Sequence, residues 1–189
     1  MIKADLSVAL LHDHMVDKNG RHITASLTLI DLHDLARSSR TYGVKNLYIA
    51  HSSEAMRKLA NLLKAHWEVG HGAEYNPNRK VALARVEICE TLEQVMADIE
   101  KRAGIKPILV ATSAREGGNR ISYEQLSEKL MQGAPHLLML GTGWGMSEEL
   151  LARADLFLGP IRGLENYNHL SVRSACAIML DRLLGNRGN

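Results

Sequence analysis

The glycine-rich segment is the part of the sequence whose residue types point most clearly to ligand binding. Residues 137–148 read LLMLGTGWGMSE, so Gly141, Gly143 and Gly145 follow an apolar run that predicts a buried strand. Glycine permits positive φ angles and lets a ligand approach the backbone closely. A tight turn between a strand and a helix would need the same residues, so the spacing alone leaves both interpretations open.

The spacing of these glycines excludes two phosphate-binding motifs. The dinucleotide fingerprint G-x-G-x-x-G opens the first βαβ unit, whereas this G-x-G-x-G lies near the C-terminal end and the next predicted strand ends at Gly159 and Pro160. A phosphate loop needs G-K-[ST], whereas acidic residues, Glu148 and Glu149, follow here. With a tryptophan between the glycines, the pattern favours a flat ligand that carries little charge.

A second group of reactive side chains lies in residues 26–42, which have helical periodicity. Leu29, Leu32, Leu35 and Ala36 form one apolar stripe. His33, Arg37 and Arg40 share the other side, beside Asp34. Arginines in such an arrangement can hold RNA and a carboxylate can accept a proton, but a solvated helix face with local ion pairs would look the same.

Three other segments could contact a metal or RNA. His12, Asp13, His14 and His22 include ligand types for a metal, but no third ligand follows at a defined spacing, so we expect none, and we place His12 at the rim of a cleft that receives substrate. Tyr75 and Arg79 put a ring beside a cation, as in RNA contacts or in an ordinary exposed turn. Arg115 lies in a loop that could close over RNA or cofactor.

Short β-rich runs that alternate with helical segments must position these residues. We expect strands at 6–11, 46–50, 84–89, 108–112, 136–140 and 155–158, and helices near 27–42, 53–67, 91–103, 122–132, 147–153 and 169–184. This order predicts an α/β fold, a mostly parallel six-stranded sheet with helices on both faces, formed by residues 1–189 as a single domain. Ligands of such sheets bind beyond the carboxyl ends of the strands, where the loops described above lie.

Composition limits the possible functions. The chain has 189 residues, 46% of them hydrophobic, and a net charge of +2, so the electropositive field of many nucleic-acid binders is absent and an RNA site must be local. Cys89 and Cys176 match no metal spacing, and we expect reduced thiols in a cytoplasmic protein. The N-terminus reads as a strand rather than a signal peptide, and charged residues in the last apolar segment exclude a membrane span.

The joint order of the motifs resembles the SPOUT superfamily of S-adenosylmethionine-dependent RNA methyltransferases, and within it a bacterial family of standalone SPOUT domains. The resemblance covers nearly the whole chain and rests on residues 28–43, Tyr75-Asn76-Pro77 with Arg79, Thr112-Ser113-Ala114, residues 138–145, Gly159-Pro160-Ile161-Arg162 and residues 168–175. It implies a C-terminal trefoil knot, a homodimer, and S-adenosylmethionine as the cofactor of methyl transfer to structured RNA, with tRNA as the expected substrate.

The resemblance also assigns roles to residues. The cofactor would be held by residues of three loops and of the last helix: Thr112, Ser113, Leu140, Gly141, Thr142, Gly143, Gly145, Leu158, Gly159, Pro160, Ile161, Leu170, Ser171 and Ala175. Arg37 would clamp or activate the substrate, with Asp34 as its orienting partner or as the proton acceptor, and Ser171 and Arg173 would complete the catalytic group. A salt bridge from Arg173 to another helix or to a partner chain is the alternative for that residue. His12, Arg40, Tyr75, Arg79 and Arg115 are the expected contacts to RNA.

Two departures from the family pattern leave the methylated atom open. Many relatives that methylate ribose have asparagine where this chain has Asp34, and serine-leucine-asparagine-valine-serine where it has residues 169–173, His-Leu-Ser-Val-Arg. The target could therefore be a base nitrogen as well as a 2′-hydroxyl. A module that binds the cofactor without transferring methyl groups, and an α/β enzyme acting on a small metabolite, are the alternative functions.

Overall fold

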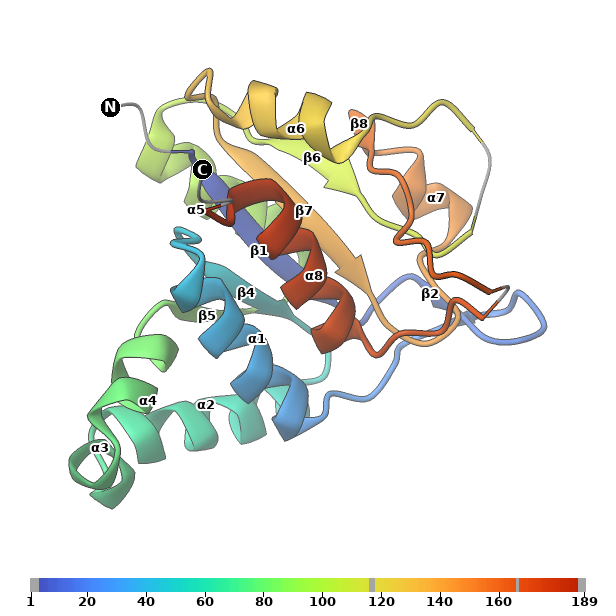
Figure 1. The fold of residues 1–189 in the computed structure, drawn as a ribbon. Helices are drawn as coiled ribbons and strands as arrows, with labels where there is room; N and C mark the ends of the chain where they lie inside the picture. Colours follow the sequence, from blue (N-terminus) through green and yellow to red (C-terminus); the bar gives the residue numbers. More distant parts are fainter. Residues whose placement is uncertain (1–3, 116–117, 166, 187–189) are drawn as a thin grey trace.

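The computed structural model describes residues 4–115, 118–165 and 167–186, and their core is a parallel six-stranded sheet. The strands lie in the order β5-β4-β1-β7-β6-β8. Their bounds are β1 Leu6–Leu11, β4 Leu47–Ala50, β5 Val86–Cys89, β6 Ile108–Ala111, β7 His136–Gly141 and β8 Leu156–Phe157. All six predicted strands are present, and the predicted sheet is confirmed (Figure 1).

Helices cover both faces of the sheet because every central strand is apolar on both sides. In β1 every residue is buried. Leu6, Val8 and Leu10 belong to the core under one helical layer, and Ala9 and Leu11 to the core under the other. The first layer contains α1 Leu29–Thr41, α2 Glu54–Glu68, α4 Pro77–Leu83, α6 Tyr123–Leu130 and α8 Val172–Leu184, and the second contains α5 Leu92–Ala103 and α7 Glu148–Leu151.

Four short elements differ from the prediction. Residues 71–83, which were expected to include an exposed turn around Tyr75, form α3 His71–Tyr75 and then α4. Asn76 caps α4 by accepting a hydrogen bond from the Arg79 N–H at 3.1 Å, and Pro77 occupies the first turn, where no donor is needed. The loop after β1 forms a small antiparallel hairpin of β2 Met15–Val16 and β3 His22–Ile23. These four elements are short and lie among polar residues, so no apolar run or sustained helical period marked them in the sequence.

The order of the strands places the functional loops. The chain runs from β1 outward to β4 and β5, then crosses to β6 on the other side of the sheet, so the strand order reverses between β1 and β7. Beyond the carboxyl ends of these central strands lie the β2–β3 hairpin, the loop after β6 and the glycine loop after β7. A reversal of this kind is where parallel sheets usually bind ligands.

Two further features concern the chain as a whole. No helix in the described part of the chain is long and apolar enough to cross a membrane. Cys89 and Cys176 are both free, and Cys176 is buried in α8.

Candidate functional site

A large cavity lies beyond the ends of β6 and β7, where α8 begins. Its volume is about 780 Å³, within the range of pockets that hold cofactors. Most of the residues predicted to bind the cofactor line it, namely Thr112, Ser113, Leu140, Gly141, Thr142, Gly143, Gly145, Ile161, Leu170, Ser171 and Ala175. Residues from four distant parts of the sequence thus meet in one hollow, as the motif order predicted.

Hydrogen bonds between the loops hold the cavity together. The Arg115 guanidinium donates to the backbone oxygen of Trp144 at 3.4 Å, which joins the loop after β6 to the glycine loop. The side-chain amide of Asn168 donates to the backbone oxygen of Ala114 at 3.0 Å, which joins the segment before α8 to the loop after β6. The Thr112 hydroxyl donates to the Met139 backbone oxygen at 2.8 Å, across the ends of β6 and β7. The three walls therefore support one another without a ligand.

The glycines of the loop after β7 are each required by the fold. Gly143 has φ +60° and Gly145 has φ +106°, a region that disfavours other residues. A Cβ atom on Gly141 would lie 2.9 Å from the Cγ atom of Met146. The loop is fastened to β2, because the Trp144 N–H donates to the Val16 oxygen at 3.1 Å and the Val16 N–H donates to the Gly145 oxygen at 2.9 Å. The glycine spacing thus has a structural explanation, while the same loop forms one wall of the cavity.

Three residues predicted to bind the cofactor do not line the cavity. They are Leu158, Gly159 and Pro160, at the end of β8. The Leu158 N–H donates to the Ala111 oxygen at 2.9 Å, and the Gly159 N–H donates to the Ile121 oxygen at 3.0 Å. These amides stabilise the edge of the sheet, so only Ile161 of this turn lines the cavity.

A network of charges at the start of α8 adds a residue that the sequence did not single out. Arg173 donates from Nη1 to Oδ1 of Asp31 at 2.8 Å, and its Nε lies 3.4 Å from Oδ2 of Asp34. Asp31 also accepts a hydrogen bond from the Thr28 hydroxyl, and only 13% of its side chain is exposed. Asp31 and Arg173 both line the cavity. Periodicity placed Asp31 at the start of a helix, where an acidic residue is ordinary, and nothing in sequence indicated its partner 142 residues away.

Asp34, expected as the orienting partner of Arg37 or as the proton acceptor, lies beside Arg173, with 3.4 Å between its Oδ2 and the Arg173 Nε. Arg37 and Arg40 are exposed on α1 and do not line the cavity. Six residues separate Arg37 from Asp31, about 9 Å along the helix axis. Of the five arginines assigned to catalysis or RNA contact, Arg115 and Arg173 line the cavity, whereas Arg37, Arg40 and Arg79 do not.

Tyr75 and Arg79 lie apart from the cavity, in α3 and α4. The Arg79 guanidinium stacks over the Trp67 ring, 4.2 Å from its centroid. Tyr75 is 80% exposed. Arg79 thus has a structural partner on α2, whereas the Tyr75 ring is open to solvent.

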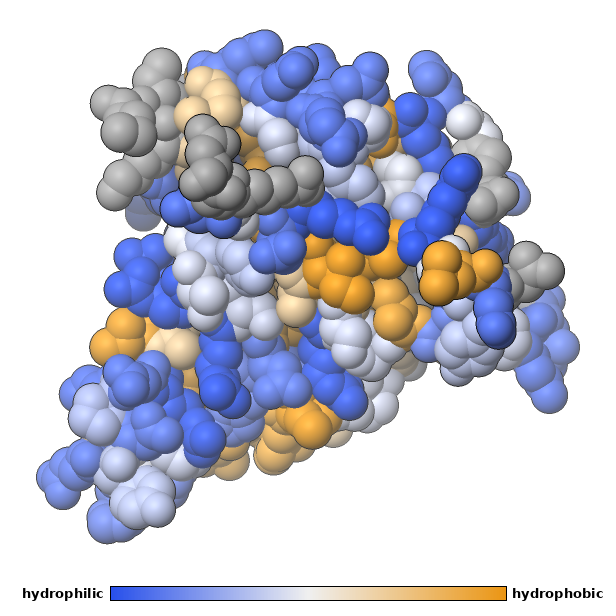
Figure 2. Space-filling view, in the orientation of Figure 1, coloured by the Kyte–Doolittle hydropathy of each residue, from blue (hydrophilic) through white to orange (hydrophobic). Residues whose placement is uncertain are grey.

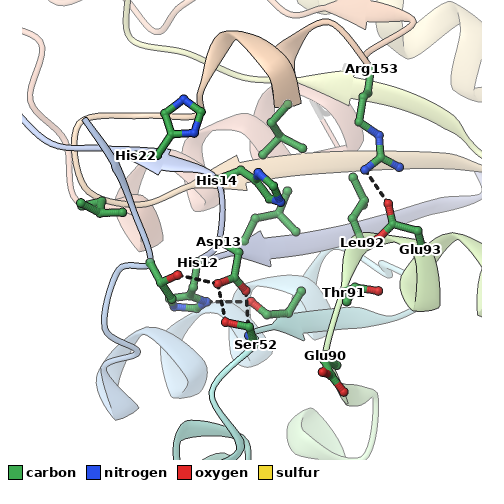
Figure 3. Close-up of a pocket in the computed structure, with 15 residues that line it drawn as sticks. His12, Asp13, His14, His22, Ser52, Glu90, Thr91, Leu92, Glu93 and Arg153 are labelled. Carbon is green, nitrogen blue, oxygen red and sulfur yellow. Dashed lines mark hydrogen bonds and ion pairs between the residues drawn. The ribbon is translucent and has the colours of Figure 1, made fainter. Parts of the chain in front are cut away.

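His12 belongs to a second cavity of about 440 Å³, on the other side of the β2–β3 hairpin (Figure 3). His22, Ile23 and Thr24 line this cavity, and the next residues, Ala25 and Ser26, line the larger one. Burial lowers the pKa of His12 below that of a free histidine. Among the described residues, no group of three or more histidine, cysteine, aspartate or glutamate side chains could hold a metal ion.

Comparison with known proteins gives relatives of two lengths. The chain is 41% identical over 181 residues to a tRNA (guanine-N(1)-)-methyltransferase of Oleidesulfovibrio alaskensis, which covers 96% of this chain and 42% of that protein. It is 39% identical over 184 residues to an uncharacterized protein of Aquifex aeolicus, which covers 97% of this chain and 90% of the relative. The chain thus spans less than half the length of the relative whose activity is named.

Solved structures of low sequence identity share the fold. The SpoU methyltransferase AviRb of Streptomyces viridochromogenes, in complex with the cofactor AdoMet, superposes with a TM-score of 0.60 at 15% identity and covers 99% of this chain and 60% of that one. A TrmH/SpoU tRNA modifying enzyme of A. aeolicus gives 0.57 at 18% identity, with coverage of 98% and 76%. The resemblance to SPOUT enzymes is therefore confirmed at the level of the fold.

A family profile settles the family itself. The profile described as SAM-dependent RNA methyltransferase matches residues 5–185, nearly the whole chain. The chain belongs to this family of SAM-dependent RNA methyltransferases.

Proposed function

We propose that this protein binds S-adenosylmethionine in the larger cavity and transfers its methyl group to RNA, with tRNA as the first substrate to test. The observation that carries the proposal is the placement of the Asp31–Arg173 ion pair on the wall of a cavity built from the loops after β6 and β7 and the start of α8. A charged pair beside a largely backbone-lined hollow suits a cofactor next to a charged RNA substrate.

The residues present fit the cofactor. Its adenine would lie against the backbone of Leu140 to Gly145, where glycines permit close approach, and the hydroxyls of Thr112 and Ser113 would mark the opposite wall. Leu170 and Ala175 supply apolar surface, and Ser171 caps α8 by accepting from the Ser174 N–H at 3.3 Å. S-adenosylmethionine would supply the methyl group from its sulfonium centre.

Arg173 would position the RNA in this mechanism. Its side chain is 33% exposed, so a phosphate or a base oxygen can compete with Asp31 and Asp34 for its donors. Release of Asp31 would leave a carboxylate beside the cavity, free to accept the proton of the methylated N–H or O–H group. Orientation of the nucleophile can supply about 7–11 kcal/mol of the barrier reduction, so the contribution of Arg173 would be chiefly geometric. Arg37 and Arg40 would contact the RNA outside the cavity.

The name of the longer relatives supports tRNA as the substrate without naming the atom. The relatives named for guanine N1 methylation are longer proteins, and the match to this chain covers 42% of their length. It is therefore one target to test, together with other base nitrogens and the ribose 2′-hydroxyl.

We also propose a single domain with a trefoil knot and assembly as a homodimer. The neighbouring SpoU folds support the knot. Large apolar side chains are exposed on the wall of the cavity, Trp144 and Leu170, and elsewhere in α1 and in the segment before α8, Ile30, Leu164 and Tyr167. Figure 2 shows apolar surface over α8 and the segment that precedes it, flanked by hydrophilic side chains. Exposed apolar surface of this kind supports contact with a second chain, and sedimentation analysis would measure the oligomeric state.

The experiment that tests the proposal is methyl transfer from labelled S-adenosylmethionine to total tRNA and total rRNA. Label in one RNA fraction, followed by digestion to nucleosides, would identify the substrate and the methylated atom. Cofactor binding without transfer to either fraction would contradict enzymatic function and favour a binding module.

A further inference from the structure

The second cavity is unassigned, and its position separates it from the site of methyl transfer. It lies beyond the ends of β1 and β4, against the start of α5, and shares no lining residue with the larger cavity. A nucleotide held in it would therefore be a different one from the nucleotide that receives the methyl group. The first three of residues 22–26 line the second cavity and the last two line the larger one. Five extended residues span at most about 18 Å, so the two cavities are close enough for one RNA strand to reach both.

The walls of this cavity are apolar at the base and polar at the mouth. Leu11, Ala50, Leu92 and Leu150 form the apolar part. Figure 3 shows Glu93 and Arg153, which form an ion pair at 2.6 Å, across the cavity from His12 and Asp13. A hollow with an aliphatic base and polar groups at its mouth fits an unpaired base, which has apolar faces and a polar edge.

Asp13 holds the walls together through three hydrogen bonds, which occupy most of the acceptor capacity of its carboxylate. Its Oδ1 accepts from the Ser52 hydroxyl at 2.6 Å and from the Thr24 hydroxyl at 2.7 Å. Its Oδ2 accepts from the Ser52 N–H at 2.7 Å. These bonds tie the β2–β3 hairpin to the loop after β4, so the cavity is preformed.

His12 supplies a further acceptor to this cavity. It is 1% exposed, and its Nδ1 lies 3.1 Å from the backbone oxygen of Ala50. A carbonyl can only accept, so Nδ1 carries the proton and Nε2 keeps its lone pair. Within the described part of the chain no group donates to Nε2. The ring is held in place by stacking on His51, with centroids 4.9 Å apart and planes 19° apart.

We propose that this second cavity binds an unpaired, amino-bearing nucleobase, adenine, cytosine or guanine, with the base donating a hydrogen bond from its amino group to Nε2 of His12. The inference rests on the proposed function, because the RNA strand that enters the larger cavity would supply a neighbouring base to this one. Recognition of a neighbouring base would let the protein select its RNA despite a net charge of only +2. A free nucleotide offers the same chemistry.

The probes are 12-nucleotide single strands of A, C or U, and AMP, CMP or UMP. Each is titrated into the full-length protein saturated with S-adenosylhomocysteine, so that the larger cavity is filled. His12→Phe keeps the ring and removes the acceptor. His22→Trp narrows the mouth from an exposed position, outside the core, and guards against a folding defect in the first variant.

We expect the wild-type protein to bind A and C strands more tightly than U strands, and each variant to lose roughly 5- to 100-fold in affinity for A and C. U strands should bind all three proteins alike. If the variants lose as much affinity for AMP and CMP as for the strands, the cavity binds a free nucleotide. If they lose affinity only for the strands, the ligand is a base of RNA.

Equal binding of A, C and U strands, or affinities unchanged in both variants, would overturn the inference. Failure of the proposed function is distinguishable from failure of this inference, because the wild-type protein would then not bind S-adenosylhomocysteine. The strand titrations do not need that ligand and would still report on the second cavity.

Discussion

Arg173 is the residue on which substrate positioning depends in this account. Two carboxylates, of Asp31 and Asp34, hold its guanidinium at the start of α8. Arg173→Gln removes the charge and the fork of paired donors, and leaves a shorter polar side chain. We expect methyl transfer to tRNA to fall about 100-fold in kcat/KM, as for loss of one preorganised donor, with S-adenosylhomocysteine binding retained.

Arg37→Ala is the matched control on the neighbouring helix. Arg37 is exposed and lies outside the cavity. We expect kcat at saturating RNA to stay as in the wild-type protein, and the slope of log affinity against log salt to decrease by about one, as for loss of one phosphate contact. A larger loss of kcat in Arg37→Ala than in Arg173→Gln would reverse the two assignments.

The sequence predicted individual site residues better than their partners. Thr112, Leu140 and Ala175 came from motif order and line the cavity. Asp31 was missed because its ion pair with Arg173 joins helices far apart in the chain. Helical spacing predicts which side chains three or four residues apart on one helix are neighbours. It does not predict contacts between two helices.

At the scale of elements, the glycine loop connects folding to cofactor binding. Gly143→Ala forces a Cβ onto a residue with φ +60°, 3.3 Å from the Val16 oxygen. Gly43→Ala has a similar strain, φ +72°, at the end of α1, where nothing lies within 4 Å of the added atom. We expect each variant to lose about 1–2 kcal/mol of unfolding free energy in urea denaturation, and only Gly143→Ala to bind S-adenosylmethionine more weakly. Equal cofactor affinity in both would remove the loop from the binding site.

The long elements could be predicted because each repeats its pattern several times. The strand at Leu6–Leu11 and the helices at 54–68 and 92–103 were predicted to within one or two residues. Leu158 and Gly159 were expected to bind the cofactor, but their amides donate to the backbone at the edge of the sheet. This was missed because the sequence predicts where each strand lies in the chain but not which strand is its neighbour in the sheet.

At the scale of the whole molecule, buried histidines set the response to acid. Burial lowers the pKa of His12 and of His136. The unfolded chain therefore takes up protons at a higher pH than the folded one, and stability is lost as the pH falls below about 6.5, the value of a free histidine. We expect the unfolding free energy to decrease from pH 7.5 to pH 5. His136→Gln should lessen that decrease, and an unchanged slope would contradict the role of His136.

Calorimetry with S-adenosylmethionine and S-adenosylhomocysteine measures whether the larger cavity holds the methyl donor. Ala175→Leu puts bulk on the wall of the cavity, while Ala177→Leu makes the same change on the same helix away from it. We predict one cofactor per wild-type chain, at least tenfold weaker binding by Ala175→Leu, and wild-type affinity in Ala177→Leu. No binding by the wild-type protein, or equal affinity in the two variants, would contradict the account.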